Sequence, residues 1–274
     1  MMLTCVRMLQ PTTLDEAYEL ITTRHKTAPL LAGGCWLRLG KRQWPAVIDL
    51  TELELEYIVK DGDEYAIGAM TTQRDVETYE AFQNLGGGIL PQALPPILGV
   101  QFRNMATIGG SVAGRFGFSD IIPALLALKA DVVLYKAGRM SLEDYLTYDK
   151  RDILIEIRIK CEQPAVALMA LRKSASDFPY LVGAMRHDAV GYSIYVGGRP
   201  GVAVKAKRAS SILTAGRENA VAEAGEAAAA ELFFESNSHA SASYRQAMTK
   251  VLIERLWYAV TTAGDNAGEV PAWK

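Results

Sequence analysis

Two glycine pairs are the residues of this chain whose type and spacing best suit ligand chemistry. Gly33-Gly34 follows an apolar stretch, and Gly109-Gly110 lies between Thr107 and Ser111. Glycine has no Cβ, so its backbone adopts positive φ readily and approaches a ligand closely. Consecutive N–H groups that turn into one concavity bind anionic oxygens, most often those of phosphate. The two pairs therefore predict a site for an anionic group, most simply phosphate.

The main alternative for the second pair is an ordinary tight turn between two strands, because glycine pairs are common in loops. Arg103 then lies on the surface instead of serving as a further anion donor. No G-x-G-x-x-G or Walker A pattern occurs, so neither a Rossmann nor a P-loop site is indicated. His25, His187 and His239 lack metal-ligand spacing, and we assign no metal site and no catalytic residue.

The bulk composition is that of an ordinary globular protein. The 274 residues are 50% apolar and 22% charged, with a net charge of −2. This balance argues against nucleic acid or a membrane as the main partner. Three widely spaced cysteines without a C-x-x-C pair fit a reducing compartment, and the first ten residues lack a signal-peptide core. We expect a cytoplasmic protein.

The patterns predict three parts, with boundaries at residues 1–55, 56–162 and 163–274. The first carries a capped helix from residue 13 and buried strands at 28–32 and 46–50. The second carries a hairpin at 57–69, strands at 131–135 and 153–159, and four helices. Those helices are expected at 72–85, 92–98, 121–128 and from 141. The third has strands near 165–173, 180–185, 191–196 and 202–205, then helices at 218–234 and 244–262.

The ordered set of motifs resembles the FAD-binding subunit of molybdenum hydroxylases, the family of the carbon monoxide dehydrogenase and xanthine dehydrogenase FAD subunits. The similarity covers nearly the whole chain and depends on Leu31-Ala32-Gly33-Gly34, Ile67-Gly68-Ala69-Met70-Thr71-Thr72 and Gln101 through Gly110. It implies an α+β, PCMH-type FAD-binding fold. Two FAD-binding α/β subdomains would hold an extended FAD, and a C-terminal domain of antiparallel sheet and helices, like that of the carbon monoxide dehydrogenase flavoprotein, would cover it.

The resemblance also implies site residues. The first loop would line the pyrophosphate with backbone amides from Leu31, Ala32, Gly33, Gly34, Cys35, Trp36 and Leu37. The second loop would do the same from the other side with Thr107, Ile108, Gly109, Gly110 and Ser111. Asp120 would bind ribose or ribityl hydroxyls, Leu154 would cover the isoalloxazine ring, and Arg172 would lie near the adenine.

Some positions depart from the family pattern. Cys35 replaces a Ser or Thr, Ser111 replaces an Asn, and the aromatic segment Phe116-Gly117-Phe118 replaces small polar residues. The amides near Cys35 would favour its thiolate, although a small side chain that fills the loop explains it equally well. Trp36 and the two phenylalanines would either stack on the cofactor or pack in a core or interface.

The resemblance implies an electron-transfer subunit of a xanthine dehydrogenase-like molybdenum hydroxylase. Electrons would come from an iron–sulfur small subunit, which receives them from a molybdopterin large subunit, and FAD here would pass them to NAD+ or another acceptor. Two alternatives are a free-standing flavin oxidoreductase and a flavin-free assembly or scaffold subunit.

Overall fold

We describe the fold from a computed structural model, which describes residues 3–24 and 27–262. The chain packs as two compact units, each built from segments that are distant in sequence. The first unit consists of Met1–Tyr79, Leu98–Gly114 and Lys129–Cys161, and the second of Glu80–Ile97, Arg115–Leu128 and Glu162–Lys274. The division into three sequence domains stays a prediction.

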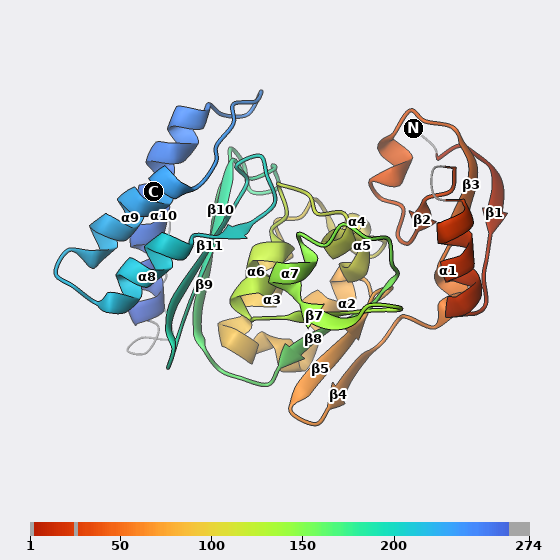
Figure 1. Ribbon diagram of the computed structural model, residues 1–274, viewed down its shortest axis with the longest axis horizontal. Coiled ribbons are helices and arrows are strands. Elements are labelled where there is room, and N and C mark those ends of the chain that lie inside the picture. Colours follow the sequence, from red (N-terminus) through yellow and green to blue (C-terminus); the bar gives the residue numbers. More distant parts are fainter. Residues whose placement is uncertain (1–2, 25–26, 263–274) are drawn as a thin grey trace. The chain divides into compact units, whose positions relative to one another are not determined.

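The first unit begins with a small parallel sheet and one helix (Figure 1). The strand order is β1-β3-β2, with bounds β1 Cys5–Leu9, β3 Trp44–Asp49 and β2 Leu30–Leu31. Helix α1, Leu14–Thr23, starts as expected at Thr13, whose hydroxyl accepts a hydrogen bond from the Glu16 amide at 3.2 Å. Ala17 and Ile21 on α1 share a buried core with Ile48 of β3. Strand β1 is an addition to the expected elements.

The first unit also contains a five-stranded antiparallel sheet. Its order is β4-β5-β8-β6-β7, with bounds β4 Ile58–Asp61, β5 Glu64–Gly68, β8 Leu154–Lys160, β6 Asp131–Leu134 and β7 Gly138–Ser141. The predicted β4–β5 hairpin is confirmed, and Gly62 in its turn has φ +63°. Strand β8 is central and pairs with β5 on one side and β6 on the other.

Short helices connect these strands: α2 Gln73–Thr78, α4 Val100–Arg103, α5 Ile108–Ala113 and α7 Leu142–Tyr145. The predicted helix over residues 72–85 is wrong in length, because Tyr79 has extended backbone angles and ends α2. Helices α4 and α5 replace what the sequence predicted as a glycine turn. Ser141 caps α7 as expected, accepting from the Asp144 amide at 3.0 Å.

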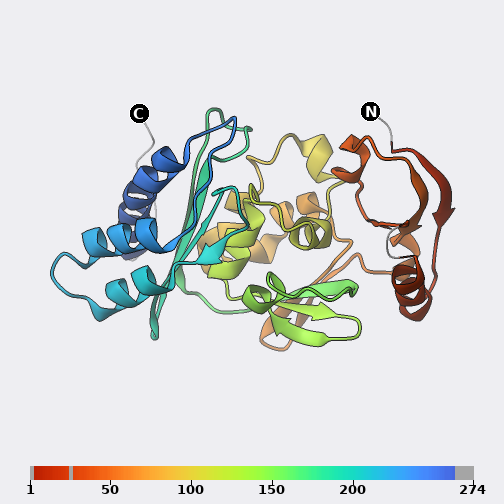
Figure 2. The same ribbon diagram turned by 45° about the horizontal axis from the view of Figure 1, so that its top comes forward.

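The second unit is an antiparallel sheet with helices on both faces. Its strand order is β12-β11-β10-β9, with bounds β12 Val204–Lys205, β11 Gly191–Gly197, β10 Leu181–Asp188 and β9 Ala165–Leu171. Helices α8 Lys207–Ala215 and α10 Ala242–Thr262 pack on one face of this sheet, and α9 Ala220–Glu231 packs against both of them, as Figures 1 and 2 show. Gly183 permits this packing, because a Cβ there would lie 2.8 Å from Leu252 Cδ2 of α10.

Two further helices, α3 Ile89–Ala93 and α6 Ile121–Ala127, pack on the same sheet. Arg186, which alternates with the core-facing Met185 on β10, donates to the Ala127 carbonyl at the end of α6 at 3.3 Å. The helix predicted over residues 92–98 is misplaced, since α3 ends at Ala93. The α+β fold class is confirmed, and no helix within residues 3–24 and 27–262 is long and apolar enough to span a membrane.

Candidate functional site

The first glycine loop follows strand β2. Residues 32–36 leave the sheet and lead into a single 3-10 turn, Leu37–Leu39. Gly34 has φ +67°, in the left-handed region that favours glycine, and its carbonyl accepts from the Arg38 amide at 3.1 Å. The predicted need for positive φ is therefore correct for Gly34.

The backbone amides of this loop are available to a ligand. Within the part of the chain that the structure describes, the N–H groups of Ala32, Gly33, Gly34 and Cys35 donate no hydrogen bond to another residue. Ala32, Gly33 and Gly34 are only partly buried, so their N–H groups can be satisfied by water or by a ligand. Four consecutive amides around a left-handed residue make the kind of concavity that binds an anion.

The two glycine loops lie against each other. A Cβ on Gly33 would come within 1.8 Å of the Met105 carbonyl oxygen, so only glycine permits this approach. A Cβ on Gly110 would lie 3.9 Å from the Ala32 Cβ. Residues that are about seventy-five positions apart in sequence are thus brought together in the first unit, as the shared-diphosphate hypothesis requires.

The second loop has a different structure from the one expected. Gly109 and Gly110 lie in helix α5, whose N-cap is Thr107. Neither glycine has a positive φ, so the predicted conformational reason for this pair is wrong. Gly109 is required for packing instead, because a Cβ there would lie 2.5 Å from the Ala69 carbonyl oxygen.

The amides of the second loop are already used within the chain. Ile108 N donates to Thr71 O, Gly109 N to Ala69 O, Gly110 N to Thr107 Oγ1 and Ser111 N to Thr107 O, at 2.9–3.1 Å. These hydrogen bonds correct the expectation that both loops offer amides equally. Among the described residues, the first loop has the backbone N–H groups without an intramolecular partner, and the second loop places small residues next to it.

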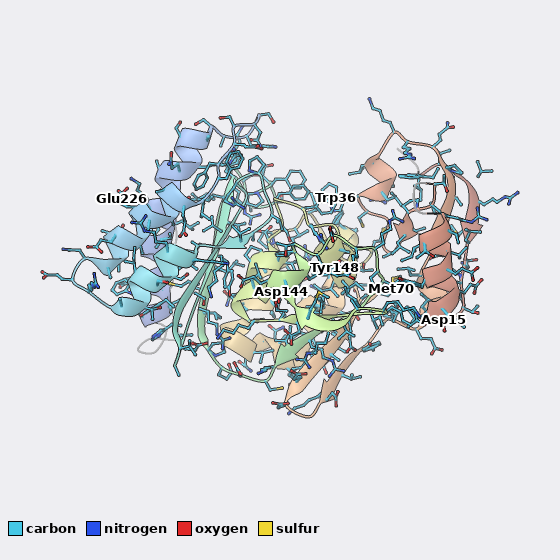
Figure 3. All side chains as sticks on the ribbon, in the orientation of Figure 1. Asp15, Trp36, Met70, Asp144, Tyr148 and Glu226 are labelled. Carbon is cyan, nitrogen blue, oxygen red and sulfur yellow. The ribbon has the colours of Figure 1, made fainter. Side chains whose placement is uncertain are left out.

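Cys35 is a buried thiol in this loop. Its Sγ lies 3.6 Å from the Gly33 carbonyl oxygen and 4.0 Å from that of Phe102. Burial raises the pKa of Cys35, and the charge of Arg38 only partly opposes this effect. The expectation that nearby amides favour a thiolate is therefore wrong, while the filling role is consistent with the packing. Trp36, labelled in Figure 3, packs edge-on against the Phe102 ring at 6.0 Å between centroids.

Arg103 is neither a surface residue nor free to meet a phosphate. Its side chain is buried and binds Glu77 of α2 through two hydrogen bonds, Nε to Oε2 at 2.8 Å and Nη2 to Oε1 at 3.1 Å. The pair joins α4 to α2 beneath the second loop. Glu77 was missed because its partner is 26 residues away, and a charged residue on a short helix usually faces solvent.

Leu154 is the first residue of the central strand β8 and is 6% exposed. Its neighbours Ile153 and Ile155 pack in the core with α1. Because side chains alternate along a strand, Leu154 faces the opposite side of the sheet. Its predicted flavin contact stays a proposal.

Asp120 and Arg172 form a buried ion pair in the second unit. The Nη2–Oδ1 distance is 2.5 Å, and Arg172 Nη1 also donates to the Asp177 carbonyl at 3.1 Å. Burial raises the pKa of Asp120, and the charge of Arg172 opposes that rise. Asp120 stands at the N-cap of α6, but its carboxylate makes no capping hydrogen bond.

The remaining aromatic residues pack among themselves. Phe116 stacks on Phe118 at 5.1 Å between centroids, and Phe118 contacts Phe178 at 4.5 Å. His187 stacks on Tyr192, whereas His25 lies outside the described residues. No group of three or more His, Cys, Asp or Glu side chains among residues 3–24 and 27–262 is placed to hold a metal ion.

Comparisons with known proteins agree on one family. Residues 4–159 match "FAD binding domain in molybdopterin dehydrogenase", and residues 167–260 match "CO dehydrogenase flavoprotein C-terminal domain". The chain is 28% identical over 270 residues to the "Uncharacterized protein YgfM" of Escherichia coli (strain K12), a match that covers 95% of this chain and 98% of that one. It is 30% identical over 163 residues to the carbon monoxide dehydrogenase medium chain of Hydrogenophaga pseudoflava, covering 54% and 56%.

A solved structure resembles the whole fold. A chain of the Hydrogenophaga pseudoflava carbon monoxide dehydrogenase that lacks the Mo-pyranopterin moiety of its molybdenum cofactor superposes with a TM-score of 0.85 at 25% identity. The superposition covers 96% of this chain and 99% of that chain.

Proposed function

We propose a function for this chain from one premise: it belongs to the family of FAD-binding subunits of molybdopterin dehydrogenases. The resemblance seen in the sequence is thereby confirmed, and the chain is the FAD subunit of an oxidoreductase complex. We propose that it takes electrons from the iron–sulfur clusters of a small partner subunit. We further propose that it passes them to NAD+ or another acceptor, while a large molybdopterin subunit oxidises the substrate.

The main support for an FAD site is the set of backbone N–H groups in the first loop that donate to no other described residue. FAD has a diphosphate with acceptor oxygens only, and the N–H groups of residues 32–35 are donors without an intramolecular partner. Gly34 has the left-handed conformation found in loops whose amides bind anions, and the close approach of Gly33 to Met105 fixes the first loop beside the second one. The residues present therefore fit a bound diphosphate.

The other predicted contacts keep supporting roles in the proposal. Gly110 leaves room beside Ala32, and Leu154 offers an apolar surface to the flavin ring. Asp120, oriented by Arg172, is proposed to accept from cofactor hydroxyls. When bound, FAD supplies the one- and two-electron chemistry, so this chain needs no acid, base or nucleophile of its own.

The substrate is selected on the molybdopterin chain, and we propose a purine, another heterocycle or an aldehyde. Cys5, Cys35 and Cys161 are all free thiols, which supports our proposal of a cytoplasmic location.

The visible spectrum of the purified chain tests this function. We expect a yellow protein that has no substrate turnover alone and reduces its flavin only when both partner subunits and substrate are added. Turnover by the isolated chain would indicate a free-standing flavin oxidoreductase. A colourless chain that cannot be loaded with FAD would indicate a scaffold subunit, and either result would overturn the proposal.

A further inference from the structure

Gln73 is a buried polar residue to which neither the sequence patterns nor the family comparison assigned a role. It is the first residue of α2 and is 3% exposed. Its backbone amide donates to the Ala106 carbonyl at 2.7 Å, which places the start of α2 directly against the lead-in to the second glycine loop.

The side-chain amide of Gln73 is half satisfied. Its Nε2 donates to Ser111 Oγ at 2.8 Å, and Ser111 Oγ in turn donates to the Thr107 carbonyl at 2.8 Å. The other end, Oε1, is shielded from solvent and has no hydrogen-bond partner in the part of the chain that the structure describes. Turning the amide over would not remove the problem, because the two NH donors would then lose their acceptor.

A buried acceptor without a donor is unfavourable, and native proteins rarely keep one without a reason. Here the unsatisfied oxygen belongs to Gln73, which is hydrogen-bonded to Ser111 of the second loop. The preceding residue, Gly110, lies beside Ala32 of the first loop. The hydrogen bond from Nε2 to Ser111 Oγ fixes the planar amide group, so Oε1 keeps one orientation as an acceptor next to the second loop.

The chemistry of this oxygen limits what it can bind. It is a neutral acceptor and needs an N–H or O–H donor, which an ionised diphosphate does not have. The sugar portions of FAD that flank its diphosphate carry hydroxyl groups, and a hydroxyl is a donor.

We propose that Gln73, oriented by Ser111, is a cofactor-binding residue whose Oε1 accepts a hydrogen bond from a ribityl or ribose hydroxyl of FAD. This proposal rests on the proposed function. Ser111, which departs from the family's Asn, would then act by positioning Gln73 rather than by donating to phosphate.

The test compares FAD affinity with the stability of the cofactor-free chain. Gln73→Met keeps the length of the side chain but removes both the hydrogen bond to the ligand and the unsatisfied oxygen. We expect the dissociation constant for FAD, measured by flavin fluorescence on the full-length chain, to rise about three- to tenfold. The melting temperature of the cofactor-free chain should stay close to that of the wild type, because removal of the unsatisfied oxygen offsets loss of the Nε2 hydrogen bond to Ser111.

Two further variants sharpen the result. Ser111→Ala should weaken FAD binding by removing the partner that orients Gln73, and the double variant should be no weaker than Gln73→Met alone. Gln92→Met is the control, since Gln92 is exposed and its Nε2 donates only to the Gly87 carbonyl. This change should leave FAD affinity unaltered.

Competition by FMN and by ADP against FAD distinguishes the two sugars. If Gln73→Met weakens FMN but not ADP, the donor is a ribityl hydroxyl, and the reverse result assigns the ribose; each supports the proposal. Wild-type FAD affinity in Gln73→Met, or an affinity loss matched by an equal loss of cofactor-free stability, would overturn it while leaving the FAD function intact. A wild-type chain that binds no FAD would instead overturn the function itself.

Discussion

Gly34 offers the sharpest test of the first loop, because its backbone strain can be separated from steric effects. Among the described residues other than its two chain neighbours, the only atom within 4 Å of an added Cβ is Leu31 Cδ1 at 3.0 Å, the end of a flexible side chain. Gly34→Ala is therefore penalised mainly by its φ of +67°, at about 1–2 kcal/mol for a residue with a Cβ in the left-handed region.

That penalty must be visible in one of two measurements. If the substituted residue keeps the left-handed conformation, the free energy of unfolding falls by about 1–2 kcal/mol. If the loop relaxes in the free protein, the same amount is lost from FAD binding, which corresponds to a rise of about 5- to 30-fold in the dissociation constant. The sum of the two losses should therefore be close to the penalty. Gly34→Asn should lose less, since asparagine tolerates this region.

Thermal melts and FAD titrations of the same preparations supply both numbers. Gly62→Ala is the matched control, because Gly62 has φ +63° and nothing lies within 4 Å of its added Cβ. It should lose stability but keep wild-type FAD affinity. If Gly34→Ala matches the wild type in both stability and affinity, the left-handed turn carries no penalty, which refutes this reasoning. If it loses only stability, as Gly62→Ala should, the turn is not linked to FAD binding.

Three other changes address the second loop, the buried pair and the sheet. Gly110→Val should raise the FAD dissociation constant at least about tenfold while the chain stays folded, because its Cβ would lie 2.8 Å from Thr107 Oγ1; full flavin loading would contradict this. Asp120→Asn should destabilise the chain by about 3–5 kcal/mol in denaturant titrations by leaving Arg172 buried without its counter-ion. If adding Arg172→Met to Asp120→Asn restores none of the lost stability, the loss is not due to the unpaired charge of Arg172. Arg139 lowers the pKa of Glu64 from its ordinary 4.5, so Glu64 stabilises the fold above that pH. The stability gap between wild type and Glu64→Gln should shrink as pH falls through the lower folded pKa, and a gap that is constant with pH would refute this.

Local patterns predicted what local chemistry controls. The capped starts at Thr13 and Ser141 and the hairpin through Gly62 follow from side-chain capping and turn propensity, which act over a few residues. Strand β1 was missed because its apolar residues Val6 and Met8 are 81% and 53% exposed, so the apolar positions in the sequence do not mark a buried face.

The sequence predicted where the two glycine loops lie better than it predicted their conformation and contacts. Adjacent glycines have low helix propensity, so the sequence did not indicate helix α5, and the need for glycine at position 109 comes from its contact with Ala69, forty residues away. The hydrogen bond between Gln73 and Ser111 and the pairing of Arg172 with Asp120 are also long-range. Such contacts depend on the assembled fold, so no local pattern in a single sequence indicates them.

The central place of β8 has a consequence for synthesis on the ribosome. This strand is the last segment of its unit to be made, yet it lies between β5 and β6, which precede it in the chain. Until β8 emerges, the nascent chain exposes the β5 and β6 edges that β8 later covers, and unpaired edges invite wrong pairing. The sheet of this unit is therefore complete only after β8 is made, although the loop proposed to hold the diphosphate precedes β8 by more than a hundred residues.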